Sequence, residues 1–470
     1  MTTSFVLPIA TCLAATHVIT LEAAQSLVAT VLSVSPETTL SRDQLQQLQT
    51  QITQALPGTT DHVALVYGGA TKIKGYVFEA ARLPEIRGAS ALLDWINGPA
   101  LTTLWQTEVG RVFQERLQLD AATARQRATD CIVYAGGGNI LALAPADMGA
   151  DLANAIERTY TEHTLTANSA AVWQAWSLLE LGHGRQPLAY GVDQFIEDWQ
   201  HERRRARLAQ YYYPPEGVAA DDWRDQALQQ RYFNRKTFGE LVTLLAVQFY
   251  RRREEQEDRA GSGGMPRSVP FYPVAPWDVR CDSSGERPAV CDVPTAEGTR
   301  PMSKASARKR YVGQVVKREQ QRDWYQERFG SDDWQILQGD EIEQQSWEQR
   351  WETYLHDHPD TPYARQWRAG NRQARPARDL REIGRQSQRY VGLIYADGNN
   401  VSRFIATLKT IDVYAAVAHI LSDCAEQSVF AALAAHLHPA PIDGEIVHPF
   451  EILTIGGDDL LIIVPGNRAF

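Results

Sequence analysis

The stretch EILTIGGDDLLIIVP, residues 451–465, consists of two apolar runs on either side of a Gly-Gly-Asp-Asp tetrad. This pattern predicts two β-strands joined by a tight turn. Gly456 and Gly457 can adopt the positive φ angles that such turns often need, and they leave room for the backbone of a ligand. Asp458 and Asp459 are then expected side by side at the tip of the hairpin.

Two adjacent carboxylates are electrostatically costly. At a separation of about 4 Å they repel each other by roughly 4 kcal/mol at an effective dielectric constant of 20. A divalent cation with oxygen ligands offsets this repulsion, so the tetrad predicts a site for Mg²⁺ or Mn²⁺. An Asp-rich hairpin turn without a metal is the alternative that the tetrad alone leaves open.

An earlier part of the chain repeats this pattern. Residues 131–145, CIVYAGGGNILALAP, can be laid on residues 451–465 without a gap, at an offset of 320 residues. The apolar run that precedes each hairpin also repeats, with residues 63–67 matching residues 391–395 at an offset of 328. Both halves therefore share the order strand, helix and glycine hairpin, which fits a βαββαβ ferredoxin-like unit.

The two halves differ in their acidic residues. Asp397 of the later half corresponds to Gly69 of the earlier one, and Asp458-Asp459 correspond to Gly138-Asn139. A structural motif does not need this asymmetry, whereas a catalytic copy beside a non-catalytic copy does. The comparison favours the metal site over the plain turn.

These patterns predict an α+β fold with two ferredoxin-like domains, of the palm or nucleotide-cyclase type, separated by a helical domain. The chain ends directly after the second hairpin, so we expect the second palm to be incomplete and the sequence to be a C-terminally truncated form. The predicted domains are a small helical region at 1–60, a first palm at 61–185, a helical and basic insert at 186–388, and a second palm at 389–470.

The chain has 470 residues, a formal net charge of −10 and 44% hydrophobic residues, which is ordinary for a globular protein and excludes a polycation. Two local segments, 301–323 and 365–389, are nevertheless basic. They are candidate contacts to an RNA backbone or to another subunit, with a solvated helix face as the alternative. Their basic residues are Lys304, Arg308, Lys309, Arg310, Lys317, Arg318 and Arg322, and Arg365, Arg368, Arg372, Arg375, Arg378, Arg381, Arg385 and Arg389.

The five cysteines are scattered and are expected to be reduced thiols. Cys281 and Cys291 resemble half of a zinc knuckle, but Ser284 stands where a second cysteine is needed, so zinc is not expected. No basic residue precedes Arg42, which argues against a secretory signal, and no apolar run reaches the roughly 18 residues of a membrane span. We therefore expect a soluble cytoplasmic protein with no membrane partner.

Asp397 follows the predicted strand 390–396 and precedes Gly398-Asn399-Asn400, where a helix is expected to begin. In a ferredoxin-like sheet the first strand neighbours the hairpin, so Asp397 can face Asp458 and Asp459. Three carboxylates could hold two cations, one to lower the pKa of an attacking 3′-hydroxyl and one to neutralise a triphosphate. The helix N-terminus would offer N–H groups to phosphate oxygens. The arrangement predicts nucleotidyl transfer on a nucleoside triphosphate.

The quoted residues resemble the large palm-containing subunit of type III CRISPR–Cas effector complexes. The resemblance is carried by IKGYVF at 73–78, EIRGASALL at 85–93, the glycine hairpin at 136–139, Asp397 and the tetrad at 456–459. It implies two palms packed face to face with ATP between them, and synthesis of cyclic oligoadenylates in a complex with other effector subunits, crRNA and target RNA.

By the same resemblance Asp397, Asp458 and Asp459 are the catalytic residues and the metal ligands. Nucleotide is expected at Gly398, Asn399, Asn400, Gly456, Gly457, Ser90, Gly136 and Gly137.

The sequence departs from this family at four places, two of which, the incomplete zinc cysteines and the end of the chain after the second hairpin, are described above. Residues 1–60 contain no His-Asp nuclease dyad, and Asn399 stands where many members have an acidic residue. Two alternatives remain: a catalytically inactive scaffold that contacts RNA, and a diguanylate-cyclase-like enzyme. Against the latter, Asp459-Leu460 replaces the Glu-Phe of that group.

Overall fold

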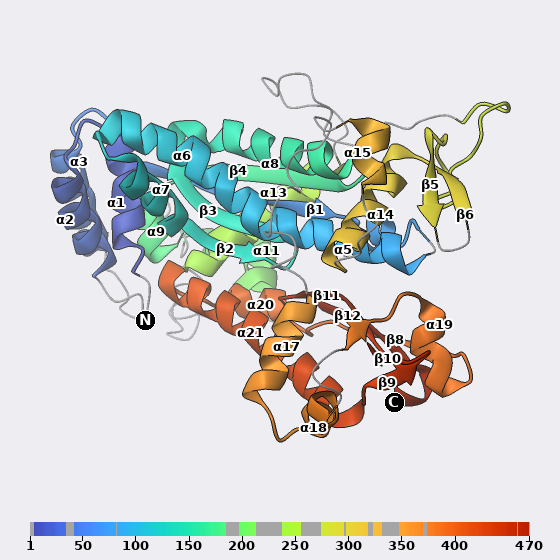
Figure 1. The fold of residues 1–470 in the computed structure, drawn as a ribbon. Coiled ribbons are helices and arrows are strands. Elements are labelled where there is room, and N and C mark those ends of the chain that lie inside the picture. Colours follow the sequence, from blue (N-terminus) through green and yellow to red (C-terminus); the bar gives the residue numbers. More distant parts are fainter. Residues whose placement is uncertain are drawn as a thin grey trace.

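The computed structural model describes residues 4–33, 42–80, 82–184, 197–212, 237–254, 274–295, 298–317, 323–330, 347–369, 374–457 and 459–469. Asp458, Arg318, Arg322 and Arg372 lie outside these residues. The chain begins with three helices, α1 (Val6–Thr16), α2 (Leu21–Leu32) and α3 (Arg42–Ala55) (Figure 1). The helical character expected for residues 1–60 is confirmed in the described part.

A four-stranded antiparallel sheet follows, with the strand order β2-β3-β1-β4. Its helices lie between β1 and β2 and between β3 and β4, and we call this assembly the first unit. The strands are β1 (His62–Thr71), β2 (Ile132–Gly136), β3 (Asn139–Pro145) and β4 (Asn168–Ser177). The helices are α4 (Ile73–Val77), α5 (Leu83–Trp95), the π-helical turn η1 (Ile96–Ala100), α6 (Leu101–Leu117), α7 (Ala121–Asp130) and α8 (Gly149–Thr164).

Both faces of the first sheet are covered because β1 is apolar on both sides. On one face, Gly68 packs against α8: a Cβ atom added to Gly68 would lie 3.1 Å from the side chain of Ile156. Tyr67, which points the other way, packs edge-on against Phe249 of α13 (Phe238–Glu254), with 5.1 Å between ring centroids. The insert therefore supplies a helix to the core of the first unit.

A second, three-stranded antiparallel sheet has the order β11-β12-β8. We call it, with the helices between β8 and β11, the second unit, which lies below the first in Figure 1 and is coloured orange to red. Its elements are β8 (Val391–Ala396), α20 (Val401–Ile405), α21 (Ile411–His436), β11 (Glu451–Gly456) and β12 (Asp459–Pro465). A small sheet beside it contains β7 (Arg375–Pro376), β10 (Glu445–His448) and β9 (Ala440–Ile442).

The second sheet is packed on both faces of its hairpin. Ile462 and Val464 of β12 join an aromatic cluster that includes Trp351 of α17 (Trp347–Asp357) and Phe430 of α21. Leu461 and Ile463, along with Leu453 of β11, belong to the large core that continues into the first unit. The alternation of side chains along β12 thus joins the two units in one core.

The pairing registers confirm the internal repeat. In each unit the first strand pairs antiparallel with the second strand of the glycine hairpin, at the offsets that the sequence shows. Each hairpin also has an irregularity at the same position, between Ile132 and Tyr134 and between Ile452 and Thr454. The α+β class is confirmed as well. The matching pairs are Val63–Pro145 with Val391–Pro465, and Tyr67–Leu141 with Tyr395–Leu461.

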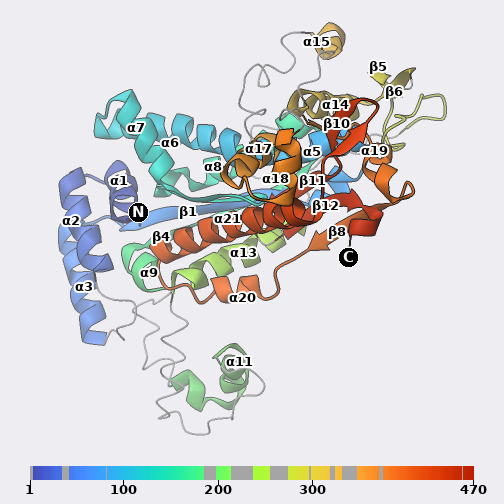
Figure 2. The same ribbon diagram turned by 60° about the horizontal axis from the view of Figure 1, so that its bottom comes forward.

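The insert contributes further short elements, and the domain boundaries within it remain predictions. These elements are α9 (Leu178–His183), α11 (Glu202–Tyr212), β5 (Cys291–Thr295), β6 (Gly298–Met302), α14 (Lys304–Val316), α15 (Trp324–Phe329), α18 (Pro362–Ala369) and α19 (Leu380–Gly384). Figure 2 shows α21 running beside α13, where Phe238 and Tyr414 are in ring contact at 5.6 Å.

Three residues of the first basic segment are buried inside the protein. Arg308, Lys309 and Arg310 of α14 are only 3%, 1% and 8% exposed, because α14 packs tightly across α5. The ammonium group of Lys309 donates to the carbonyl of Tyr76 and pairs with Glu79, both at 2.7 Å. Burial lowers the pKa of Lys309 to about 7. For these three residues, both the RNA contact and the solvated-face alternative are wrong.

Some arginines of the second basic segment form ion pairs with nearby carboxylates. Arg375 pairs with Glu382 at 2.8 Å and with Glu445 at 2.6 Å, and Arg385 pairs with Asp443 at 3.1 Å. These contacts tie α19 to the β9–β10 hairpin. Contact between RNA and the exposed arginines 365, 381 and 389 remains a prediction.

Candidate functional site

The two glycine hairpins touch each other tip to tip. A Cβ atom on Gly456 would lie 2.6 Å from the Cα atom of Gly137, and one on Gly137 would lie 3.1 Å from the nitrogen of Gly457. Gly137 and Gly457 have φ angles of +57° and +60°, so both turns need glycine there. Sequence analysis expected the space beside Gly456 to accommodate a ligand. In the structure the backbone of Gly137, in the hairpin of the first unit, occupies that space.

Replacing Gly456 with valine is expected to destabilise the contact between the units. The added side chain must displace the backbone of Gly137, and overpacking of this kind costs about 1–3 kcal/mol. Urea unfolding of the purified protein measures the loss. Gly98→Ala is the matched control, because a Cβ atom there meets nothing within 4 Å. Equal stability of the two variants would contradict the hairpin contact.

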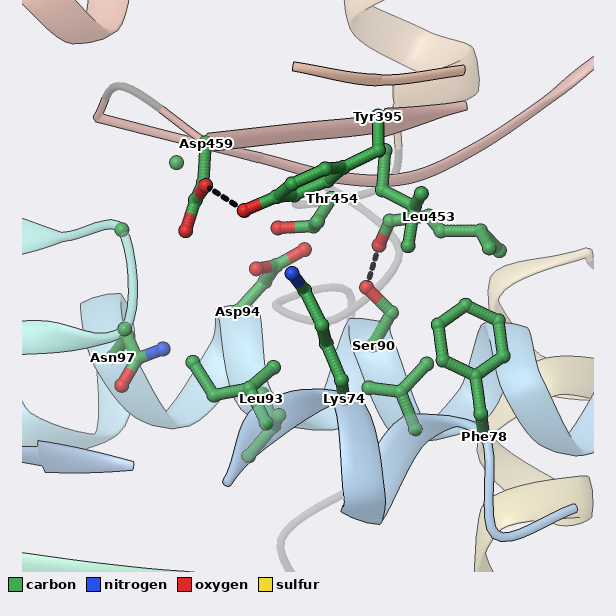
Figure 3. Close-up of a pocket in the computed structure, with 16 residues that line it drawn as sticks. Lys74, Phe78, Ser90, Leu93, Asp94, Asn97, Tyr395, Leu453, Thr454 and Asp459 are labelled. Atoms are coloured by element: carbon green, nitrogen blue, oxygen red, sulfur yellow. Dashed lines mark hydrogen bonds between the residues drawn. The ribbon is translucent and has the colours of Figure 1, made fainter. Parts of the chain in front are cut away.

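A pocket of about 660 Å³, part of it open to solvent, lies beside this contact (Figure 3). We call it the interunit pocket, because both units line it. The polar and aromatic lining residues are Lys74, Phe78, Ser90, Asp94 and Asn97 from the first unit, and Tyr395, Thr454 and Asp459 from the second.

Asp397 and Asp459 lie at the same end of the second sheet. Leu460 pairs with Ala396, the last residue of β8, so Asp397 follows directly at the end of the strand that neighbours β12, which begins at Asp459. The hydroxyl of Tyr395, two residues before Asp397, donates a hydrogen bond of 2.9 Å to the Asp459 carboxylate. That Asp397 faces Asp458 and Asp459, as sequence reasoning expected, remains a prediction.

The absence of the acid from the first unit has a steric cause. β1 continues past Gly69 to Thr71, and Gly69 pairs with Asn139 as Asp397 would pair with Asp459. A Cβ atom on Gly69 would lie 2.1 Å from the carbonyl oxygen of Gly138. No side chain fits there, so an acid-bearing pair is possible only in the second unit.

Ser90 joins the two units through its hydroxyl. The Ser90 side chain donates a hydrogen bond to the carbonyl of Leu453, at the irregular position of β11 (Figure 3). One turn earlier on α5, Arg87 pairs with the fully buried Glu451 at the start of β11. Ser90 lines the interunit pocket, and its contact with nucleotide remains a prediction.

Asp94 lies one turn beyond Ser90 on α5. Its side chain is exposed to solvent and lines the interunit pocket. Loss of hydration raises the pKa of Asp94 to about 6, an effect that the charge of Arg350 partly offsets. The sequence reading gave this residue no role.

The variant Asp94→Asn is expected to gain stability relative to the native protein as pH rises. Between the ordinary pKa near 3.8 and the raised value of about 6, the folded state binds more protons than the unfolded state, so the native protein loses stability as pH increases through this window. Asparagine does not titrate. Thermal unfolding at pH 4 and pH 7.5 measures the difference, and a pH-independent difference would contradict the assignment.

Lys74 is a second residue that sequence reasoning left without a role. Its ammonium group lies 3.6 Å from the centroid of the Tyr395 ring, across the boundary between the units. The pKa of Lys74 is raised, chiefly by its interaction with the Tyr395 hydroxyl and further by the carboxylates of Asp459 and Asp397. Both carboxylates are therefore close enough to act on the same ammonium group. The sequence offered a signal for Tyr395, because it stands two residues before Asp397 and alternate residues of a strand point to the same face.

The chemistry of the donors suits a hard divalent cation, because Asp397 and Asp459 both offer carboxylate oxygens. Within the described ranges no group of three or more His, Cys, Asp or Glu side chains is arranged to hold a metal ion. Asp458, the third predicted ligand, lies outside those ranges. Of the zinc-knuckle pair, Cys281 is buried with its thiol on Ser306 at 3.3 Å, and Cys291 begins β5.

The other predicted nucleotide contacts divide into two groups. Gly137 and Gly456 line the interunit pocket, whereas Gly136, Gly457 and residues 398–400 are not part of its lining. The helix expected after Asn400 is present as α20, but it has only five residues, which limits its dipole. In the part of the chain that the structure describes, no helix has the length and apolar character needed to cross a membrane.

No family model matches the chain, and no curated protein matches it. Among solved structures, the chain is similar to the Csm1–Csm4 cassette in complex with cA4, at 14% identity and a TM-score of 0.36, over 90% of this chain and 48% of that one. It is also similar to the cassette in complex with pppApA, at 13% identity and a TM-score of 0.37, over 96% and 50% of the two chains. The chain thus spans about half the length of these structures.

Proposed function

We propose that the chain is a nucleotidyltransferase that joins ATP units into cyclic oligoadenylates, as the palm-containing subunit of a type III CRISPR effector complex. The observation that supports the proposal is the position of Asp459 in a pocket lined by two repeated hairpins, beside the strand that leads directly into Asp397. We further propose that both units are ferredoxin-like palms, since the first has the strand order β2-β3-β1-β4 and the second repeats its central register.

In the proposed reaction the 3′-oxygen of one ATP forms a bond to the α-phosphorus of another. The bond from that phosphorus to the bridging oxygen of the β-phosphate breaks, pyrophosphate leaves, and the hydroxyl proton passes to solvent. Divalent cations held by Asp397, Asp458 and Asp459 would neutralise phosphate charge and favour the alkoxide. Tyr395 fixes the Asp459 carboxylate through its 2.9 Å hydrogen bond, so the acid is already oriented before nucleotide binds.

One structural feature bears on the partners of the chain. Arg308, Lys309 and Arg310 of α14 are buried inside the protein, so target RNA and crRNA would contact other surfaces, such as the exposed arginines of the second basic segment. The adenine specificity of the reaction rests on the family resemblance alone. GTP is therefore a necessary competitor in any assay, because a diguanylate-cyclase-like enzyme would prefer it.

The proposal is tested with the protein assembled with its effector subunits, crRNA and target RNA. The complex is incubated with α-³²P-labelled ATP or GTP and Mg²⁺ or Mn²⁺, and products are separated and identified by mass spectrometry. We expect phosphatase-resistant oligoadenylates from ATP, formed only with a divalent cation. Binding of ATP without any product would support the scaffold alternative, and products from GTP alone would support the diguanylate-cyclase alternative.

A further inference from the structure

Lys74 is the cationic side chain of the interunit pocket that comes from the first unit. It projects from α4 to the Tyr395 ring on β8, and Tyr395 in turn donates its hydrogen bond to Asp459. Figure 3 shows the lysine rising from the helix toward this pair. Lys74, Tyr395 and Asp459 thus form a chain of contacts that crosses from one unit to the other.

Lys74 also lies where two cavities meet. A second pocket, of about 870 Å³ and largely open, is lined by Lys74, Asp459 and Ile73, all of which line the interunit pocket too. Aromatic residues of α13, Phe249 and Tyr250, form another part of its wall. A ligand entering from either side therefore reaches the same ammonium group and the same carboxylate.

A cation at this junction offsets the negative charges of the nearby carboxylates and of a bound triphosphate. Asp397 and Asp459 both act on Lys74 electrostatically, and a triphosphate placed beside them would add several more negative charges. Divalent cations neutralise part of that charge, but they are shared between the protein carboxylates and the phosphates. Lysine binds phosphate as a point charge, and the aromatic face of Tyr395 restricts where its ammonium group lies.

We propose that Lys74 is a positioning residue that the first unit contributes to the reaction centre of the second, where its ammonium group binds phosphate oxygens of the nucleoside triphosphate beside Asp459. The inference rests on the proposed function and adds a residue to it. It gives the first unit, which lacks the acids, a chemical part in the reaction. Tyr395 acts as the platform that holds the lysine at the junction.

The test measures binding rather than turnover. The affinities for ATP, ADP, AMP and adenosine are determined by calorimetry, first in EDTA and then with Mg²⁺, for the native protein, Lys74→Ala and Lys74→Arg. Lys74→Ala removes a hydrogen bond to a charged phosphate group. We therefore expect this variant to bind ATP about tenfold more weakly or worse, and to bind adenosine, which has no phosphate, as tightly as the native protein does. Lys74→Arg keeps the charge and is expected to recover most of the affinity.

The matched control is Lys304→Ala. It removes the same charge and a similar contact, because the Lys304 ammonium group lies over the Phe329 ring at 5.4 Å, outside both pockets. We expect ATP binding to be unchanged in this variant. Lys74 is exposed on a short helix, so circular dichroism is expected to show intact folding for all three variants.

Four outcomes separate the possibilities. A selective loss of phosphate affinity in Lys74→Ala supports the inference. Equal losses for ATP and adenosine would show that Lys74 only packs against Tyr395, and tighter ATP binding would show that it competes with the metal; either result overturns the inference. If the native protein binds no ATP with or without Mg²⁺, the proposed function itself fails, independently of Lys74.

Discussion

Asp459→Asn is expected to reduce the formation of oligoadenylates by about 100-fold or more. Loss of a metal-bound carboxylate removes several kcal/mol of charge stabilisation in the transition state, and each 1.4 kcal/mol corresponds to about tenfold in rate. The fold is expected to survive, because the amide oxygen of asparagine can still accept the hydrogen bond from Tyr395. The rate of conversion of labelled ATP in the assembled complex measures the effect.

The control for this variant is Asp292→Asn, which removes the same charge from an exposed position on β5. We expect its rate to match that of the native protein. Binding of Mn²⁺, followed by electron paramagnetic resonance, gives a second readout that does not depend on turnover. An Asp459→Asn protein that keeps more than a tenth of the native rate would show that this carboxylate does not hold the catalytic cation.

Arg87→Ala is expected to cause the largest loss of stability, about 3–5 kcal/mol, because it leaves a buried carboxylate without its main partner. Glu451 has no solvent exposure. Its remaining contacts are the Trp347 indole N–H at 2.8 Å and the Lys317 ammonium group at 3.5 Å, and Lys317 is shared with Glu348 at 2.6 Å. Urea unfolding measures the change in free energy.

Arg111→Ala is the matched control for Arg87→Ala. Arg111 pairs with Glu115 at 3.2 Å on the exposed face of α6, where ion pairs contribute about 0–1 kcal/mol. The double variant Arg87→Met with Glu451→Gln is expected to recover much of the loss, since it removes both charges together. If Arg87→Ala costs no more than Arg111→Ala, the buried pair does not hold the units together.

The parts of the fold that the sequence predicted correctly have local causes. Apolar runs around Gly136 and Gly456 specify hairpins whatever surrounds them, and the match between residues 63–67 and 391–395 carried over into identical registers. The position of Asp397 directly after β8, the strand that neighbours β12 of the hairpin, followed from that topology. Local periodicity and the repeat were therefore sufficient to predict the framework of the site.

The remaining features depend on contacts between distant segments. Arg308 and Lys309 look like a solvated basic face, because nothing nearby in the sequence shows that carbonyl oxygens of α4 and α8 will accept from them. Lys74 lacks a role until the fold brings Tyr395 to it. Ser90 was predicted to contact nucleotide, but its observed partner is a carbonyl exposed by a strand irregularity. Such partners become visible only in three dimensions.

The meeting of the hairpin tips bears on how the chain arose. Gly137 contacts Gly457, which is its own counterpart in the repeat, so the interface is isologous, as in a twofold dimer. A surface that recognises itself needs only one gene, and an ancestral single-module protein would have paired through it as a homodimer with two equivalent centres. Fusion of two copies of such a gene would preserve that association within one polypeptide and would leave one copy free to lose its acids.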